Sequence, residues 1–163
     1  MTKTAAPELD RPVGHPLSSP DELRAYVPYL LHRLTHRWSI DQREALEAVD
    51  LNPTRMRILA SLSAYGVLTI NELSVLAITE QSSTSRNVEF LVESGLVRRE
   101  INEDDQRLRS VALTEGGRRK VAEMAPIINN LYARLIEDLT PSELRTCIKA
   151  LQKMADRICV NKV

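Results

Sequence analysis

The sequence contains few of the residues on which small β-sheet domains and metal modules depend. Aromatic residues make up 4% of the 163 residues, and there are only 5 glycines. Since β-sandwiches and barrels rely on aromatic residues and frequent glycine turns, an all-β fold is disfavoured, and abundant Leu, Ala, Arg and Glu favour helices. The two cysteines, Cys147 and Cys159, form no CxxC pair and have no histidine nearby, which argues against a zinc module or a disulfide framework.

Long apolar runs and an excess of charge are also missing. No run approaches the roughly 18 residues of a membrane span, and residues 1–10 lack the apolar core of a signal peptide, so we expect a cytoplasmic protein with no membrane partner. The 22 basic residues balance the 22 acidic ones. Because net charge gives no indication of a nucleic-acid partner, any case for DNA binding must rest on local geometry.

Sequence signatures of catalysis are missing as well. The chain has no glycine-rich phosphate loop, no HExxH motif and no nucleophile elbow. The neighbouring carboxylates Glu103, Asp104 and Asp105 form a predicted charged tip, and catalysis would need a pocket around them. We therefore expect no enzyme, no resident metal and no cofactor.

The first 50 residues divide into an arm and a helical region. Half of the prolines lie within residues 1–20, which predicts a flexible or extended arm over 1–19. Ser19-Pro20-Asp21-Glu22 predicts a helix start, and apolar residues at three- and four-residue steps continue from Leu23 to Trp38. Pro28 is a candidate kink. For 20–50 either one long helix or a break at Ser39 fits the pattern.

Residues 51–114 follow the order helix, short helix, short helix, hairpin. Asn52-Pro53 predicts the start of a helix that ends at Gly66, and Thr69-Ile70-Asn71-Glu72 is a capping box for a helix to about Ala77. The next helix is expected over 81–94, followed by two alternating segments, 96–101 and 108–113, around a polar tip. This order is that of a winged helix-turn-helix with a small β-hairpin wing, in a mainly α protein.

Two amphipathic helices are expected over 115–163. Thr114 caps the first, in which Pro126 is a candidate bend, and Thr140-Pro141-Ser142-Glu143 caps the second. Cys147 falls on the apolar stripe of the last helix and is expected to be a small buried side chain. The two helices carry more apolar face than a winged helix of about 60 residues can cover, so we expect a partner surface.

Residues 51–114 resemble the MarR family of bacterial transcriptional regulators, and the likeness extends more loosely from about Leu30 to Ile158. Its motifs occur in the expected order and at the expected spacing. They are Glu72-Leu73, Ser82-Ser83-Thr84-Ser85-Arg86, Leu91, Gly95-Leu96-Val97, Arg99, Asp105-Gln106-Arg107 and Leu113-Thr114-Glu115-Gly116. The resemblance implies a homodimer whose N- and C-terminal helices form a dimerisation domain and whose winged-helix lobes bind a pseudo-palindromic operator. It also implies a repressor that responds to a small aromatic or anionic effector.

Polar residues on the second short helix are the predicted DNA contacts. If Thr84, Val88 and Leu91 point inward, the opposite face is free to enter the major groove. Arg86 can then make a bidentate contact to guanine, and its neighbours can contact bases or phosphates. The predicted set is Gln81, Ser82, Ser83, Ser85 and Arg86. Phe90, where the family commonly has a polar or basic residue, is expected either to contact thymine methyl or sugar groups or to pack against the wing.

The wing tip is the second predicted contact. Arg107 can reach into a narrow minor groove with Asp105 bracing its guanidinium, and Arg109 lies nearby. From Arg86 to Arg109 there are five arginines against six acidic residues. Binding should therefore depend on a few directed contacts and show a moderate salt dependence.

A ligand site is expected near the first long helix, where the resemblance places the effector. The candidates are Tyr29, His32, Arg33 and His36, with Arg33 as the partner of an anion. The i, i+4 histidines also suit a metal, but no third ligand is visible, and a plain surface or interface pair is the alternative. Two other functions remain open, namely a winged-helix protein-interaction module that does not bind DNA, or a small-molecule-binding helical dimer.

Overall fold

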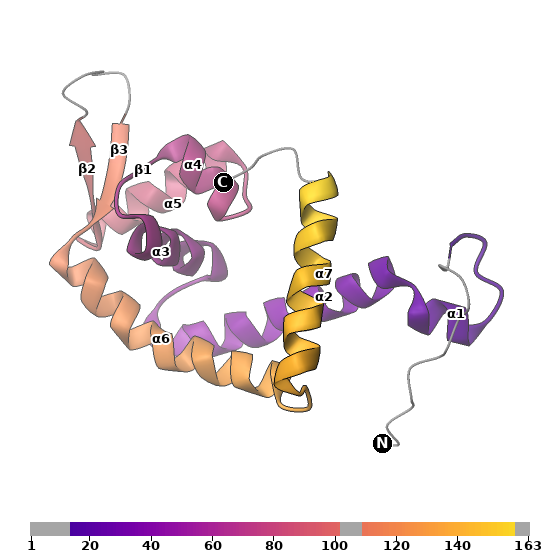
Figure 1. Cartoon of the computed structure of the whole chain (residues 1–163). Coiled ribbons are helices and arrows are strands. Elements are labelled where there is room, and N and C mark those ends of the chain that lie inside the picture. Colours follow the sequence, from indigo (N-terminus) through magenta and orange to yellow (C-terminus); the bar gives the residue numbers. More distant parts are fainter. Residues whose placement is uncertain (1–13, 102–108, 159–163) are drawn as a thin grey trace. The chain divides into compact units, whose positions relative to one another are not determined.

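The chain forms two compact units in a computed structural model that describes residues 14–101 and 109–158. Unit 1 comprises residues 1–41 and unit 2 residues 42–163. Figure 1 labels the helices and strands of both. No helix among the described residues is long and apolar enough to cross a membrane.

Unit 1 contains α1 (Pro20–Ala25) and most of α2 (Val27–Leu46). The predicted N-cap is confirmed, because the Ser19 hydroxyl accepts a hydrogen bond from the Glu22 amide at 3.1 Å. The predicted kink at Pro28 is wrong: the break lies at Tyr26, which is extended, and Pro28 is the second residue of α2. Proline is tolerated there because a first-turn amide needs no helical partner. Helix α2 then continues through Ser39, which decides between the two alternatives for this region.

The helix boundaries predicted for the first part of unit 2 are confirmed. After a 3₁₀ turn, Glu47–Val49, helix α3 spans Pro53–Tyr65, with the Asn52 side chain accepting from the Arg55 amide at 2.8 Å. Helices α4 (Ile70–Leu76) and α5 (Gln81–Glu93) follow. The turn between them passes through Ile78, which has a positive φ of 52° and is 82% exposed.

A three-stranded antiparallel sheet completes the winged helix. Strands β2 (Val97–Ile101) and β3 (Arg109–Leu113) are the predicted hairpin, with Arg99 opposite Val111. The sequence pattern missed β1 (Leu68–Thr69), which pairs with β3 through Leu68 and Val111. A strand of two residues has no periodicity to detect, since it is defined only by its pairing with a strand about 40 residues away.

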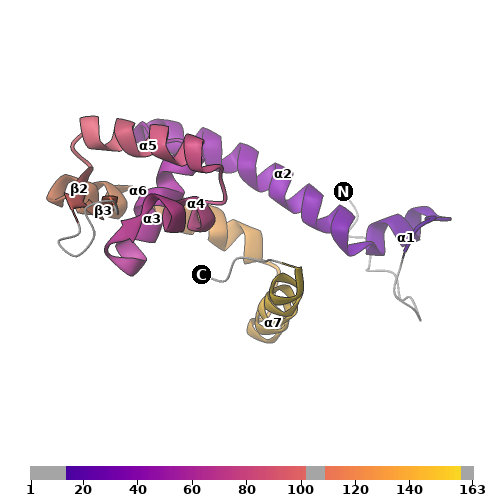
Figure 2. The ribbon, with the colours of Figure 1, turned by 90° about the horizontal axis from the view of Figure 1, so that it is seen from above.

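The core of unit 2 lies between α3, α4, α5, the sheet and the first half of α6 (Glu115–Ile136). Figure 2 shows α5 on one side of this core, alongside α3 and α4. The side chains that are fully buried include Leu46, Ile58, Leu59, Leu73, Val88, Leu91 and Val111. Burying side chains of this size contributes about 1.5 to 3 kcal/mol each to the stability of the fold. The core therefore fixes which face of α5 points to solvent.

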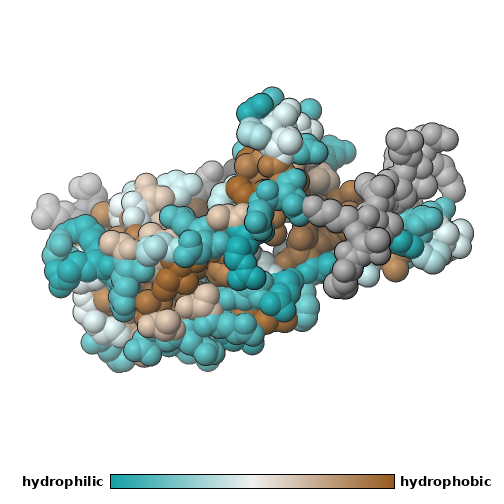
Figure 3. Space-filling view, turned by 90° about the horizontal axis from the view of Figure 1, so that it is seen from below, coloured by the Kyte–Doolittle hydropathy of each residue, from teal (hydrophilic) through white to brown (hydrophobic). Residues whose placement is uncertain are grey.

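The last two helices leave apolar residues uncovered. Helix α7 (Pro141–Ile158) has no buried residue, and in α6 only Gly117 and Met124 are buried. Cys147, expected to be buried, is exposed in the single chain, because none of the residues that the structure describes covers the stripe on which it lies. Figure 3 shows apolar residues exposed along the part of unit 2 formed by α6 and α7. The large exposed apolar residues there are Tyr132, Leu135, Leu139, Ile148, Leu151, Met154 and Ile158.

The capping box of α4 predicts a pH-dependent contribution to stability. The Thr69 hydroxyl accepts from the Glu72 amide, while the Glu72 carboxylate accepts from the Thr69 amide at 2.8 Å and from the Thr69 hydroxyl. The Thr69 backbone and side-chain hydrogen bonds lower the pKa of Glu72 in the folded chain. The ionised form thus stabilises the fold above the pKa of the unfolded state, and this contribution is lost as the pH falls through the folded pKa.

We expect Thr69→Ala to cost about 1 kcal/mol of unfolding free energy at pH 7, the usual cost of losing an N-cap. Glu72→Gln should be less stable than the unaltered chain at neutral pH, with the difference shrinking as the pH falls below about 4.5. Urea unfolding of the three chains at several pH values and one protein concentration measures both effects. A Glu72→Gln deficit that stays constant down to pH 3 would contradict the role of the carboxylate.

Candidate nucleic-acid interface

Helix α5 turns a buried face to the core and a polar face to solvent. Thr84, Val88 and Leu91 are each 0% exposed, as the sequence predicted. Of the predicted contacts, four are exposed and Ser83 is half-buried. The exposed ones are Gln81, Ser82, Ser85 and Arg86. The structure thus brings all five together on one helix, in its first two turns.

The arginine of this set, Arg86, is exposed and weakly held. The only hydrogen bond found for Arg86 among the described residues joins its Nε to the Ser82 carbonyl at 3.4 Å, a long distance for this type of bond. No side chain caps the first turn of α5, because the N-cap residue Glu80 makes no such bond. The exposed, uncapped positive end of the helix and the exposed guanidinium suit a polyanionic partner.

Of the two alternatives for Phe90, packing against the wing is wrong, and contact with DNA stays a prediction. The Arg55 guanidinium of α3 lies 3.4 Å from the centre of the Phe90 ring, so the ring packs under an arginine rather than against the wing. The ring is still 39% exposed. Cation–π stacking on a phenyl face is favourable, and it explains how an aromatic side chain is kept on the polar face of α5.

Asn87 completes this contact and was not singled out from the sequence. Its side-chain amide donates to the Ser83 carbonyl at 2.9 Å, and its oxygen accepts from the Arg55 Nε at 3.2 Å. We find no further partner for the two Nη groups of Arg55 among the described residues. No local pattern indicates this arrangement, because the residues it joins are 32 positions apart and meet only when α3 packs on α5.

A second arginine of α3 has a structural role. Arg57 donates from Nε to the Ala77 carbonyl at 2.7 Å, at the end of α4, and burial lowers the pKa of its guanidinium. It therefore ties α3 to the turn that precedes α5. Two arginines separated by one residue thus have different roles. Arg57 holds the helix-turn-helix together, whereas Arg55 lies at the edge of the polar face of α5.

Two ion pairs offset acidic charge near this face. Glu89 of α5 pairs with Arg99 of β2, and Glu100 pairs with Arg98 within β2 at 2.6 Å. Both carboxylates therefore have a cationic partner on the same lobe. The count between Arg86 and Arg109 already includes both arginines, so the pairing leaves the excess of one acidic residue unchanged and places each of these two carboxylates next to a cation.

The predicted wing-tip residues Asp105 and Arg107 lie outside the described residues, so their positions are not described. Arg109 is the first residue of β3, paired in register with Ile101. The hairpin strands run from the end of α5 to the start of α6. The wing is thus continuous with the same lobe that presents α5 (Figure 1).

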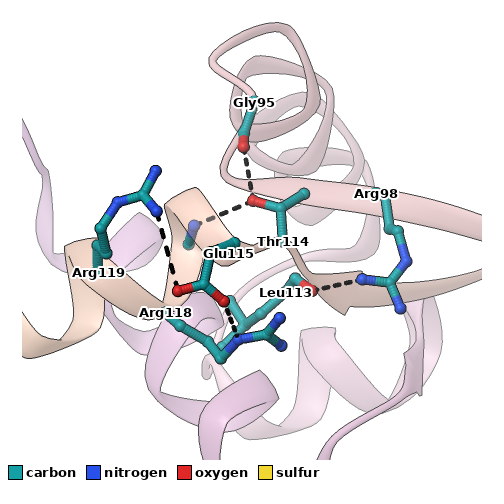
Figure 4. Close-up of polar contacts among 8 residues, drawn as sticks. Gly95, Arg98, Leu113, Thr114, Glu115, Arg118 and Arg119 are labelled. Carbon is teal, nitrogen blue, oxygen red and sulfur yellow. Dashed lines mark hydrogen bonds and ion pairs between the residues drawn. The ribbon is translucent and has the colours of Figure 1, made fainter.

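The base of the wing is joined tightly to α6. The Thr114 hydroxyl donates to the Gly95 carbonyl at 2.6 Å and accepts from the Gly117 amide at 3.0 Å (Figure 4). A Cβ placed on Gly117 would lie 2.0 Å from the Leu96 carbonyl oxygen. The glycine is therefore required for the backbone of α6 to approach the chain entering β2.

The predicted ligand residues lie on α2 in unit 1. Tyr29 is half-buried, and the Arg33 guanidinium lies 5.7 Å from the centre of its ring. His32 and His36 are exposed. No group of three or more His, Cys, Asp or Glu side chains that can hold a metal ion occurs among the described residues.

Comparison with known proteins agrees with this geometry. A crystal structure of a MarR family transcriptional regulator from Silicibacter pomeroyi matches with 45% identity and a TM-score of 0.81, over 88% of this chain and 96% of that one. The chain belongs to the MarR family. The model of the MarR family itself matches residues 51–108, the segment that contains α3, α4, α5 and β2. The chain is therefore a DNA-binding transcriptional regulator. The MarR family consists of transcriptional regulators and not of enzymes.

Other members of the MarR family match over most of their length. The transcriptional repressor IacR of Pseudomonas putida is 29% identical over 85% of this chain and 86% of its own. A mutant form of MarR from E. coli, complexed with operator DNA, is 25% identical with a TM-score of 0.70, over 78% of this chain and 92% of that one.

Proposed function

We propose that the chain is a homodimeric repressor that binds a pseudo-palindromic operator and responds to a small aromatic or anionic effector. In this proposal residues 51–114 are the DNA-binding domain, and residues 20–50 and 115–163 form the dimerisation region, with residues 1–19 as an arm. The observation that carries the proposal is the exposed polar face of α5 with its exposed Arg86. The names of IacR and of the operator-bound E. coli MarR support repression and operator binding.

In the proposed complex, α5 enters the major groove and the wing reaches the neighbouring minor groove. Arg86 reads guanine, while the serines and Gln81 contact bases or phosphates near the helix start. Asp105, Arg107 and Arg109 keep their predicted roles at the wing, with Arg107 as the residue that enters the minor groove.

Arg55 adds a phosphate contact to this proposed interface. Its guanidinium is held by the exposed Phe90 ring and by the half-buried Asn87 on the flank of α5, so it is ordered before DNA arrives. A pre-ordered arginine loses little side-chain entropy on binding a phosphate, and its Nη groups form a fork that matches two phosphate oxygens. It lies beside α5, where the DNA backbone flanks the groove.

We expect Arg55→Gln to weaken binding to specific and unrelated DNA by the same factor and to reduce the slope of log affinity against log salt by about 1. Arg57→Gln is not a suitable control, because Arg57 has a structural role. A suitable control is Arg134→Gln, which changes an exposed arginine near the end of α6. Fluorescence anisotropy titrations at several salt concentrations measure both quantities. A loss confined to specific DNA would mean that Arg55 reads sequence instead.

Dimerisation is proposed because a single chain leaves its terminal helices uncovered. All residues of α7 are at least partly exposed, and α2 exposes Leu30, Leu31 and Leu34 to 39%, 37% and 54%. Patches of this kind on helices mark association surfaces, since burying them removes apolar area from water. Light scattering during size-exclusion chromatography should give the mass of two chains.

The proposed effector contacts are Tyr29, His32, Arg33 and His36 of α2. Arg33 stacked near Tyr29 offers a cation and a ring edge to a small aromatic acid. This part of the proposal predicts that an effector changes DNA affinity and that Arg33→Gln weakens the response to it, while DNA binding without the effector stays the same. A titration of DNA affinity against effector concentration tests it.

The experiment that tests the proposed function is anisotropy of the full chain with DNA from upstream of its own gene and with a scrambled duplex. Nanomolar, sequence-dependent binding supports the proposal, and the protected site should contain two half-sites about one helical turn (10 base pairs) or a small multiple apart. If neither this DNA nor genomic DNA fragments selected by the protein show sequence preference, the chain would instead act as a protein-interaction module.

A further inference from the structure

A cavity of about 300 Å³ opens at the base of the wing, in unit 2 and away from the polar face of α5. It lies between the end of α3, the turn into β1, the strands β2 and β3, and the start of α6. Four apolar residues and two arginines supply most of its wall. They are Leu62, Val67, Ala112 and Leu113, with Arg98 and Arg118.

The charges around this cavity do not cancel. Arg98 pairs with Glu100, and Glu115 is shared by Arg118 at 3.0 Å and Arg119 at 3.8 Å. These three arginines and two carboxylates leave one excess positive charge. Figure 4 shows Arg98 and Arg118 beside the end of β3, where Arg98 also donates to the Leu113 carbonyl at 2.7 Å.

The two arginines are held at the mouth of the cavity in different ways. Arg98 uses its Nη groups for Leu113 and Glu100, so it is fixed in place and supplies charge rather than free donors. Arg118 is bound through Nε, and among the described residues we find no partner for its Nη groups. Arg118 is therefore the side chain that can form a forked contact to a carboxylate while the apolar wall covers the rest of the ligand.

We propose that this cavity binds a small organic anion, a carboxylate on a compact apolar body, with Arg118 as its main partner. The site is separate from the effector residues proposed on α2, and its existence does not depend on DNA binding. Because its wall joins the wing to α6, a bound anion would contact both the DNA-binding lobe and the helix that leads out of it.

Calorimetric titration of the full chain with sodium benzoate, benzyl alcohol and inorganic phosphate tests this site. We expect saturable binding of benzoate and at least about tenfold weaker binding of benzyl alcohol, which lacks the charge, and of phosphate, which lacks the apolar body. Phosphate binding as tight as benzoate would overturn the proposal, since charge alone would then account for it, and so would an absence of saturable benzoate binding.

Paired variants assign the binding to this cavity. Arg118→Gln should weaken benzoate about tenfold or more, whereas Arg119→Gln, which removes the same charge from an arginine that shares Glu115 but does not line the cavity, should weaken it clearly less. Ser63→Phe, which places a ring in the cavity from the exposed side of α3, should block it, while Ala64→Phe should not.

Equal losses in Arg118→Gln and Arg119→Gln would overturn the proposal, and so would full benzoate affinity in Ser63→Phe. Benzoate binding that survives both Arg118→Gln and Ser63→Phe belongs to another site. Because the readout is ligand binding without DNA, failure here leaves the proposed regulator function untouched, and failure to bind DNA leaves this site untouched.

Discussion

Gly117→Ala is expected to lower the free energy of unfolding by about 3 kcal/mol or more. Alanine usually stabilises a helix relative to glycine by up to about 1 kcal/mol. At this position, however, the added Cβ would lie 2.0 Å from the Leu96 carbonyl oxygen and 3.0 Å from a methyl carbon of Leu113. Because the close atom is backbone, α6 must move away from the chain entering β2, which strains a packed region.

The neighbouring glycine provides the matched control for this prediction. A Cβ on Gly116 would lie 3.1 Å from the Gly95 carbonyl oxygen, a tight but smaller conflict, and the helical preference of alanine opposes it. Gly116→Ala should therefore stay within about 1 kcal/mol of the unaltered chain. Urea unfolding followed by circular dichroism measures both variants at one protein concentration. Equal midpoints for Gly117→Ala and Gly116→Ala would mean that α6 does not approach the wing as described.

Arg86→Gln is expected to reduce affinity for the specific DNA by about 1 to 3 kcal/mol, or roughly 5- to 150-fold. A bidentate arginine–guanine contact discriminates between bases, so affinity for scrambled DNA should change far less. The fold should be unaffected, since Arg86 is exposed and its only hydrogen bond found among the described residues is the 3.4 Å contact to Ser82.

Anisotropy with specific and scrambled duplexes separates the proposed role of Arg86 from that of a general cation. Arg134→Gln removes the same charge from an exposed position on α6 and should leave both affinities unchanged. Arg55→Gln should lower both affinities together, and Arg86→Gln mainly the specific one. A uniform loss for Arg86→Gln would show that it contacts phosphate and that sequence is read elsewhere.

Most of the local structure of this chain was determined by its sequence. The caps at Ser19, Asn52 and Thr69 begin helices where the residue types predict, because a side chain that accepts from an amide three residues on acts without tertiary help. The inward residues of α5 were likewise identified from a 3.6-residue period, since apolar side chains on one face must be buried together.

The misjudged features each depend on neighbours in space. The short strand β1 exists only through its pairing with β3, and Phe90 packs under Arg55 only because α3 lies against α5. Cys147 lies on an apolar stripe, but its burial requires a covering surface that the single chain does not provide. Periodicity shows which side of a helix is apolar, and it says nothing of what that side meets.

The features of the candidate site likewise divide into those that the sequence determines and those that only the tertiary structure decides. The sequence alone determined that Gln81, Ser82, Ser85 and Arg86 of α5 face outward, because helical geometry fixes their direction once the buried residues are known. Only the tertiary structure brought Arg55 to the edge of that face and two arginines to one cavity. Contacts between elements far apart in the chain depend on how helices and strands pack, which no short-range pattern in the sequence encodes.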